Sequence, residues 1–327
     1  MSFDLTTQFG SLELKSPIIV GSCPMTAQEL QRIAMVSNGA GAIAMPSLFE
    51  EHFSNTAARP EQNLDDYLRL VEQASQQLSI PVIASISGGS STPWENVVAK
   101  IESAGAHAIE FSFRQSNPRV YRGPREIEDS IVESAKRIND LVSIPLIVKL
   151  TRNYTSIGDL GRQLNNYVQG LVLFGRAPVI DIELDSLKLS SSWGLTQPGS
   201  IVQSLESIMG VRANCPELPL AACGGIDTSI DLIKALLAGA NAAMITSSIY
   251  RNGASAIGSM IEGLKCYMER HEMNSMAELA RRNLASSQDA GNHCSYEELV
   301  LASQDRAMAT DSPTFECDRW GHPRSSK

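Results

Sequence analysis

The segment "PLAACGGIDTSIDLIKALLAGANAAMITSS", residues 219–248, decides the fold class. It contains two short apolar runs, and the residues between them have the apolar repeat of a helix. The first run ends in Gly224-Gly225 and the second ends in Ser247-Ser248. A strand, a helix and a second strand in this order predict a βαβ unit with parallel strands.

The same alternation of apolar runs and helical segments extends over most of the 327 residues. Proline begins several runs and glycine follows several helical segments, as expected because proline lacks a donor and glycine tolerates positive φ. Eight such units predict an α/β protein with a (β/α)8 TIM barrel. The alternative, a doubly wound open sheet, would need fewer units and a separate second domain. The expected strands are residues 17–23, 42–47, 81–87, 108–113, 145–151, 170–175, 218–225 and 242–248.

Two segments fall outside the repeat. Residues 3–17 alternate around Phe9-Gly10 and predict an N-terminal β-hairpin that closes the bottom of the barrel. Residues 176–200 form an insertion after strand six, on the side where barrels build active sites, and we expect a lid or pocket wall there. We therefore expect one barrel domain over residues 1–272 and a polar C-terminal tail over residues 273–327.

Composition favours a small-molecule partner. The net charge of −9 argues against binding to nucleic acid or to an anionic membrane, because such surfaces need clustered Lys and Arg. No apolar run approaches the roughly 20 residues that span a bilayer, so a cytoplasmic location is expected. The six cysteines contain no C-x-x-C pair, and no metal site is predicted.

The glycine pair is a candidate phosphate site. In barrel enzymes the turns after strands seven and eight commonly bind a phosphate, and glycine lets an anion approach the backbone N–H groups. Thr228 and Asp231 resemble a capping box, and the hydroxyls of Ser247 and Ser248 would complete the cradle. The alternative interpretation is a tight turn between strand and helix.

Lys149 interrupts the apolar strand "PLIVKLT" near its C-terminal end. A buried Lys requires an anionic partner, and Glu110 on the neighbouring strand is the candidate. A structural ion pair inside the barrel is one interpretation. A catalytic or binding role is the other, since catalytic groups cluster at the C-terminal ends of barrel strands.

Four motifs are informative in combination, namely "GAGAIAMPSLFEEHF", "PLIVKLT", "GLVLFG" with "IDIEL", and "AACGGIDTSIDLIKALLAGANAAMITSSIYRNG". Together they resemble the class 1 dihydroorotate dehydrogenases, and most closely a divergent branch of that family. The resemblance covers roughly residues 3–265, and it implies a TIM barrel that binds FMN at its top and oxidises dihydroorotate by hydride transfer to the flavin. It further implies a role in pyrimidine biosynthesis and a homodimer. Because the sequence has no cluster-binding cysteines, we expect a soluble electron acceptor or a partner protein.

The resemblance also assigns residues. Lys149 would face the flavin and its ribityl chain, and Gly21 with Ser22 would pack against the ring. The positions assigned to the cofactor are Gly21, Ser22, Ser47, Ser112, Lys149, Gly224, Gly225, Ser247 and Ser248.

Some positions depart from the family pattern. Pro46 stands where the family has a flavin-contacting Lys, while Ser112 and Gly175 each stand where it has Asn. Gln115 occupies about the position of the catalytic Cys or Ser, and a one-residue shift makes Ser116 the candidate base. The predicted catalytic residues are thus Lys149 and Ser116.

Three functions remain open at this level. The first is an FMN-dependent oxidoreductase acting on a small organic substrate. The second is a non-catalytic barrel that keeps the phosphate site and acts as a binding or assembly subunit, as the changes at Pro46, Ser112 and Gly175 suggest. The third is an isomerase or aldolase with Lys149 as a Schiff-base nucleophile.

Overall fold

The computed structural model describes residues 3–52, 64–89, 94–114, 122–176 and 179–285. One compact unit covers Met1–Ser286, and so extends past the expected domain boundary at residue 272. Residues 286–327, which include most of the expected tail, and Ser116 lie outside the described residues.

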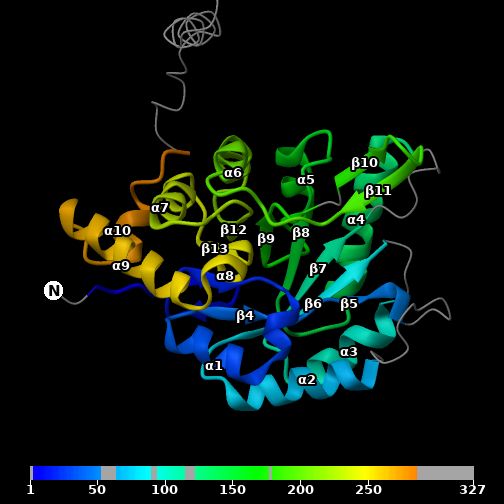
Figure 1. Cartoon of the computed structure of the whole chain (residues 1–327), viewed down its shortest axis with the longest axis horizontal. Coiled ribbons are helices and arrows are strands. Elements are labelled where there is room, and N and C mark those ends of the chain that lie inside the picture. The colour runs from blue at the N-terminus through cyan, green and yellow to red at the C-terminus, as the bar shows by residue number, and fades with distance from the viewer. Residues whose placement is uncertain (1–2, 53–63, 90–93, 115–121, 177–178, 286–327) are drawn as a thin grey trace, which may run out of the picture. The chain divides into compact units, whose positions relative to one another are not determined.

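Eight parallel strands form a closed barrel, as the sequence predicts (Figure 1). Consecutive strands pair side by side, the last strand pairs with the first, and the second pairs with the third, which closes the cylinder. An open doubly wound sheet would leave two edges, so that alternative is excluded. The barrel strands are β3 (Ile18–Val20), β4 (Ala42–Ala44), β6 (Val82–Gly88), β7 (Ala108–Phe113), β8 (Leu146–Leu150), β9 (Gly170–Leu173), β12 (Leu220–Cys223) and β13 (Ala242–Ile245).

Helices surround the barrel, because each crossover buries the apolar stripe of a helix against the sheet (Figure 1). In α2, for example, the buried residues Tyr67, Val71 and Ala74 recur at spacings of four and three. The helices are α1 (Glu29–Ser37), α2 (Leu64–Gln77), α3 (Glu95–Ser103), α4 (Pro124–Asn139), α5 (Ile157–Leu164), α6 (Val202–Asn214), α7 (Ser229–Leu237), α8 (Ser247–Asn252), α9 (Ser255–Arg270) and α10 (Met276–Ala280). Shorter elements are η1 (Pro24–Ala27), β5 (Leu48–Phe49) and η2 (Glu50–His52).

The barrel interior is filled by side chains from alternate positions of each strand. The predicted hairpin, β1 (Thr7–Phe9) and β2 (Leu12–Leu14), buries Phe9, Leu12 and Leu14 at the bottom. Above it, strand alternation gives a layer of Ile19, Ile83, Ile147 and Ala221. The next layer holds Ala44, Glu110, Val172 and Met244, and the uppermost holds Gly21, Ser85, Lys149 and Cys223. Polar groups therefore enter the interior only toward the C-terminal ends of the strands.

The insertion after strand six forms a second hairpin, with β10 (Val179–Glu183) antiparallel to β11 (Lys188–Ser192) (Figure 1). Strand alternation and the cross-strand pairing divide its side chains between two faces. One face is mostly polar, with Val179 as its apolar residue. The other carries Ile180, Ile182 and Leu189, and Leu184 and Leu187 lie in the turn between the strands. These five aliphatic residues are between 58 % and 82 % exposed. The lid role of residues 176–200 stays a prediction.

Arg212 of α6 links the loops at the bottom of the barrel. Its guanidinium donates to the carbonyl oxygens of Gly239 (2.9 Å) and Pro216, and to Oδ1 of Asn241 (2.6 Å). The same Asn241 oxygen accepts from the backbone N–H of Leu220, the first residue of β12. One side chain thus positions the N-terminal ends of β12 and β13, the two strands that carry the candidate phosphate site.

We expect Arg212→Ala to lower the free energy of unfolding by about 2 kcal/mol, because the buried Gly239, the half-buried Asn241 and the exposed Pro216 lose a shared charged donor at once. Urea unfolding followed by circular dichroism measures this change. Arg162→Ala is the control, since Arg162 forms a surface ion pair with Asp159 and its loss should have far less effect. Equal stability of the two variants would contradict the linking role of Arg212.

Candidate functional site

The predicted site residues that are described lie at the C-terminal ends of the barrel strands. Lys149 and Ser112 are neighbours in the register of β8 and β7. Gly21 and Ser22 follow β3, and Ser47 follows β4. Two glycines follow β12, and two serines begin α8 directly after β13. The barrel therefore gathers residues separated by more than 200 positions in sequence.

Lys149 and Glu110 form an ion pair inside the barrel, with 3.5 Å between Nζ and Oε1. The Glu110 side chain is 1 % exposed and that of Lys149 is 13 % exposed. Nζ also lies 3.2 Å from Sδ of Met244. Burial is the largest single influence and acts to lower the pKa of Lys149. The Glu110 carboxylate, together with Cys223 and Cys23, acts in the opposite direction, and the net effect raises the pKa of Lys149. Lys149 therefore carries a positive charge at neutral pH.

The positive charge of Lys149 argues against the interpretation of this residue as a Schiff-base nucleophile. A lysine nucleophile must be neutral when it attacks a carbonyl, and enzymes achieve this by lowering its pKa. The carboxylate of Glu110 does the opposite to Lys149. The arrangement disfavours an aldolase and suits a fixed cation that faces the barrel mouth.

A chain of hydroxyl groups connects Glu110 to the rim of the barrel. Ser85 donates to Oε1 of Glu110 (3.1 Å), and the Ser85 and Ser47 oxygens are 2.9 Å apart. Ser47 and Ser22 are also 2.9 Å apart. Because the Ser85 proton is used on Glu110, Ser47 must donate to Ser85, and Ser22 must then donate to Ser47. The oxygen of Ser22 is left to accept a hydrogen bond from above.

The hydroxyl chain shows what sequence reasoning missed. The sequence predicts Ser22 and Ser47 as flavin contacts. The structure joins these two serines directly to each other and, through Ser85, to Glu110. Ser85 is not among the predicted site residues. The signal was present in "ASIS", where Ser85 and Ser87 occupy alternate positions of an otherwise apolar strand. Such a spacing places both side chains on one face, here the barrel interior.

One oxygen of the Glu110 carboxylate, Oε2, is buried and has no hydrogen-bond partner among the described residues. Leaving a buried acceptor without a donor costs about 1–3 kcal/mol. The uppermost interior layer contains only small side chains apart from Lys149, which leaves the carboxylate close to the barrel mouth. A bound group with an N–H or O–H donor would suit this position.

Gly175 clarifies one departure from the family pattern. A Cβ atom at this position would lie 3.2 Å from Cγ of Lys149 and 3.5 Å from Cδ and Cε. The Lys149 side chain therefore packs against the position of a residue 175 side chain, closely enough that an Asn there would require Lys149 to shift slightly. Gly21 is more strongly constrained, since its Cβ would lie 2.4 Å from Oγ1 of Thr246.

Gly224 and Gly225 both have positive φ values, 93° and 76°, which favour glycine. A Cβ at Gly224 would have no neighbour closer than 3.6 Å, so an approaching group meets little obstruction there. A Cβ at Gly225 would lie 2.2 Å from Oγ of Ser200 and 2.6 Å from the backbone nitrogen of Ile201. Gly225 therefore fits the interpretation of a tight turn between strand and helix. Space for an approaching ligand lies beside Gly224.

The predicted capping box of α7 is confirmed. Thr228 accepts from the backbone N–H of Asp231, and Oδ2 of Asp231 accepts from the N–H groups of Asp227 (3.1 Å) and Thr228 (3.0 Å). The backbone N–H groups at the N-terminal end of α7 therefore donate to a carboxylate of the same helix, that of Asp231. Ser248 is fully buried, and its hydroxyl lies 3.5 Å from the carbonyl oxygen of Asp227.

Thr196 lies between the two halves of the cradle and was not predicted. Its backbone N–H donates to Oγ of Ser247 (3.0 Å), and its Oγ1 accepts from the N–H of Gly225 (3.2 Å). Arg251 donates to the Thr196 carbonyl oxygen and pairs with Asp227 at 2.6 Å. In the sequence, the surrounding "GLTQPGS" indicates only a turn.

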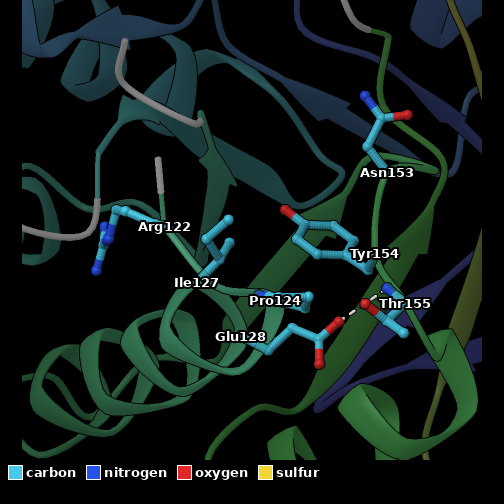
Figure 2. Close-up of a pocket in the computed structure, with 7 residues that line it drawn as sticks. All are labelled: Arg122, Pro124, Ile127, Glu128, Asn153, Tyr154 and Thr155. Carbon is cyan, nitrogen blue, oxygen red and sulfur yellow. Dashed lines mark hydrogen bonds between the residues drawn. The ribbon is translucent and has the colours of Figure 1, made fainter. Parts of the chain in front are cut away.

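A separate pocket of about 260 Å³ lies between the start of α4 and the loop after β8 (Figure 2). The carboxylate of Glu128 accepts from the backbone N–H of Thr155 there (2.9 Å), and burial raises the pKa of Tyr154. None of the predicted cofactor residues lines this pocket. Its lining residues are Arg122, Pro124, Ile127, Glu128, Asn153, Tyr154 and Thr155.

We expect Glu110→Gln to lower the pKa of Lys149, because burial remains while the carboxylate charge is removed. The reaction of Lys149 with trinitrobenzenesulfonate at pH 8 should accelerate by about tenfold for each unit of the decrease. Peptide mass spectrometry resolves each lysine, and Lys234, exposed on α7, serves as the internal control. An unchanged rate at Lys149 would contradict the proposed origin of its charge.

Comparisons with known proteins place this architecture in a family. The family model described as dihydroorotate dehydrogenase matches residues 46–268. The catalytic subunit of dihydroorotate dehydrogenase B (NAD(+)) from Pyrococcus abyssi is 27 % identical over 292 residues, covering 82 % of this chain and 95 % of the relative. The corresponding subunit from Methanocella arvoryzae is 26 % identical, covering 82 % and 94 %.

A relative with a different name also matches. Dihydroorotate dehydrogenase A (fumarate) from Lactobacillus delbrueckii subsp. bulgaricus is 26 % identical over 220 residues, covering 64 % of this chain and 71 % of the relative. The family match spans more than half of the chain and includes the strands that carry Lys149, Glu110 and the glycine pair. The chain belongs to the dihydroorotate dehydrogenase family.

Proposed function

We propose that the protein is an FMN-dependent oxidoreductase in which a small organic substrate transfers a hydride to a flavin at the C-terminal mouth of the barrel. Membership in the dihydroorotate dehydrogenase family supports a flavin-dependent dehydrogenase. The observation that carries the proposal is the charged pair of Lys149 and Glu110 at the mouth, where one carboxylate oxygen has no hydrogen-bond partner among the described residues. FMN supplies the two-electron acceptor that no protein side chain provides.

The residues at the mouth suit such a cofactor. The open side of Gly224 and the hydroxyl of Ser247 would hold the phosphate, while Lys149 would place a fixed positive charge beside the flavin. Gly21 would present its backbone to the flavin ring. The Ser22 oxygen would accept a hydrogen bond from the flavin, because the Ser22 proton is donated to Ser47. Ser47 supports Ser22, and Ser112 lies next to Lys149 on the adjoining strand.

Dihydroorotate is the first substrate to test, with pyrimidine biosynthesis as the corresponding pathway. A catalytic base would come from the loop after β7, where Ser116 remains the prediction. The relatives are named for NAD(+) or fumarate as the electron acceptor. For this chain we propose a soluble acceptor or an acceptor subunit, since six of the matched relatives are named as catalytic subunits.

The non-catalytic alternative also has a specific observation in its favour. Pro46 and Gly175 remove two polar side chains that the family pattern places at the mouth, and the start of α6 fills the space beside Gly225. A barrel of this kind would bind a phosphorylated ligand without reducing it. Flavin content and flavin reduction separate this alternative from the oxidoreductase.

We expect the purified protein to contain one FMN per chain, with absorption bands near about 370 and 450 nm that bleach when substrate is added. Gly224→Ala should weaken FMN binding by about tenfold, because it strains a backbone with positive φ and narrows the approach. Gly105→Ala creates similar strain in the loop before β7 and is the control. A colourless protein that fails to bind added FMN would exclude the oxidoreductase.

The homodimer is also part of the proposal. The aliphatic face of the β10–β11 hairpin is exposed, and an isolated two-stranded ribbon is only marginally stable in water. Two copies of an uncharged aliphatic face are complementary to each other. We propose that the two chains pack through this face.

We expect Ile182→Asp with Leu189→Asp to convert a dimer to the 35.4 kDa monomer in light scattering, because these cross-strand partners form the centre of the aliphatic face. Ser192→Asp places one such charge on the opposite, mostly polar face of the hairpin and should leave the dimer intact. A wild-type monomer, or dimers in both variants, would contradict this interface.

A further inference from the structure

We infer that Thr196 is a phosphate-binding residue, and that the hydroxyls of Thr196 and Ser247 are the donors of the cradle in place of the Gly225 N–H. This inference rests on the proposed function, because the phosphate is taken to be that of FMN. It changes which groups hold the anion, since the sequence pointed to the backbone of the glycine pair.

The first observation is that the backbone N–H of Gly225 already has a hydrogen-bond acceptor within the protein. Its N–H donates to Oγ1 of Thr196 at 3.2 Å, and the space where a Gly225 side chain would lie is filled by Ser200 and Ile201. The Gly225 carbonyl oxygen accepts from the N–H of Gly199 at 2.9 Å. Both backbone groups of Gly225 are therefore committed to the segment before α6.

The second step is the direction of the two hydroxyl protons. Oγ1 of Thr196 accepts from Gly225, and Oγ of Ser247 accepts from the Thr196 N–H at 3.0 Å. Each oxygen thus receives a backbone proton, and neither hydroxyl donates to an acceptor among the described residues. A hydroxyl has one proton to donate, so two adjacent donors remain for a ligand.

The third step is the local charge. Asp227 is paired with Arg251, and the Asp231 carboxylate accepts from two backbone N–H groups and the Thr228 hydroxyl. These nearby carboxylates are therefore compensated, and an anion is not strongly repelled. Arg251 also donates to the Thr196 carbonyl oxygen, which holds the Thr196 backbone in place.

A competing interpretation uses the same contacts. Thr196 could occupy the cradle in place of the phosphate, so that a ligand would have to displace it from Gly225 and Ser247. The two interpretations predict opposite effects when the Thr196 hydroxyl is removed. Loss of a donor weakens binding of a phosphate, whereas loss of a competitor strengthens it.

The test compares FMN with riboflavin, which lacks the phosphate, on the full-length protein after removal of bound flavin. Flavin fluorescence gives both dissociation constants for the wild type, Thr196→Val and the matched control Thr196→Ser. We expect Thr196→Val to weaken FMN binding about five- to tenfold and to leave riboflavin binding unchanged. Thr196→Ser keeps the hydroxyl and should bind FMN as the wild type does. Equal or tighter FMN binding by Thr196→Val would overturn the inference.

A second variant guards against a folding defect. Ser247→Ala removes the other donor and should also weaken FMN more than riboflavin, at a melting temperature that is checked for each variant. If wild-type protein binds neither flavin, the proposed function fails, and 31P NMR with inorganic phosphate tests the cradle alone. Phosphate binding that Thr196→Val abolishes would then support the inference, and absence of phosphate binding would overturn it.

Discussion

The ion pair between Lys149 and Glu110 is the interaction on which the candidate site depends. Two charges inside a barrel are stable only if they are paired and if further hydrogen bonds satisfy them. Ser85 provides one such bond to Glu110, and Met244 provides a polarisable contact to Lys149. The carboxylate also acts to raise the pKa of Lys149. The pair therefore stabilises two buried charges and keeps a cation at the mouth of the barrel.

Barrel closure makes this arrangement rigid. Glu110 and Lys149 lie on neighbouring strands, and both strands are paired on each side. Below them the interior is apolar, and the layer that contains Lys149 also contains Gly21, Ser85 and Cys223. An apolar interior below and small or polar side chains near the top separate the part of the barrel that stabilises the fold from the part that would receive a ligand.

The proposed phosphate site at the mouth is built differently, because its polar groups are backbone amides and hydroxyls. Gly224 and Gly225 share a left-handed backbone but differ in surroundings, one open and the other covered by Ser200 and Ile201. Thr196 connects this turn to Ser247 and so joins the ends of β12 and β13 across the mouth. A segment that belongs to the insertion after strand six therefore lies at the proposed phosphate site.

Local patterns were sufficient to predict the eight strands, the N-terminal hairpin, the capping box at Thr228 and the pairing of Lys149 with Glu110. Each of these depends on side-chain alternation, helical spacing or the cost of burying a charge, which are properties of short segments or neighbouring strands. The tertiary structure alone decided that Ser85 links Ser47 to Glu110, that Lys149 fills the space beside Gly175, and that Thr196 uses the Gly225 amide. Those contacts join residues from 25 to 38 positions apart, and only the pairing of neighbouring strands and the folding of the insertion bring such residues into contact.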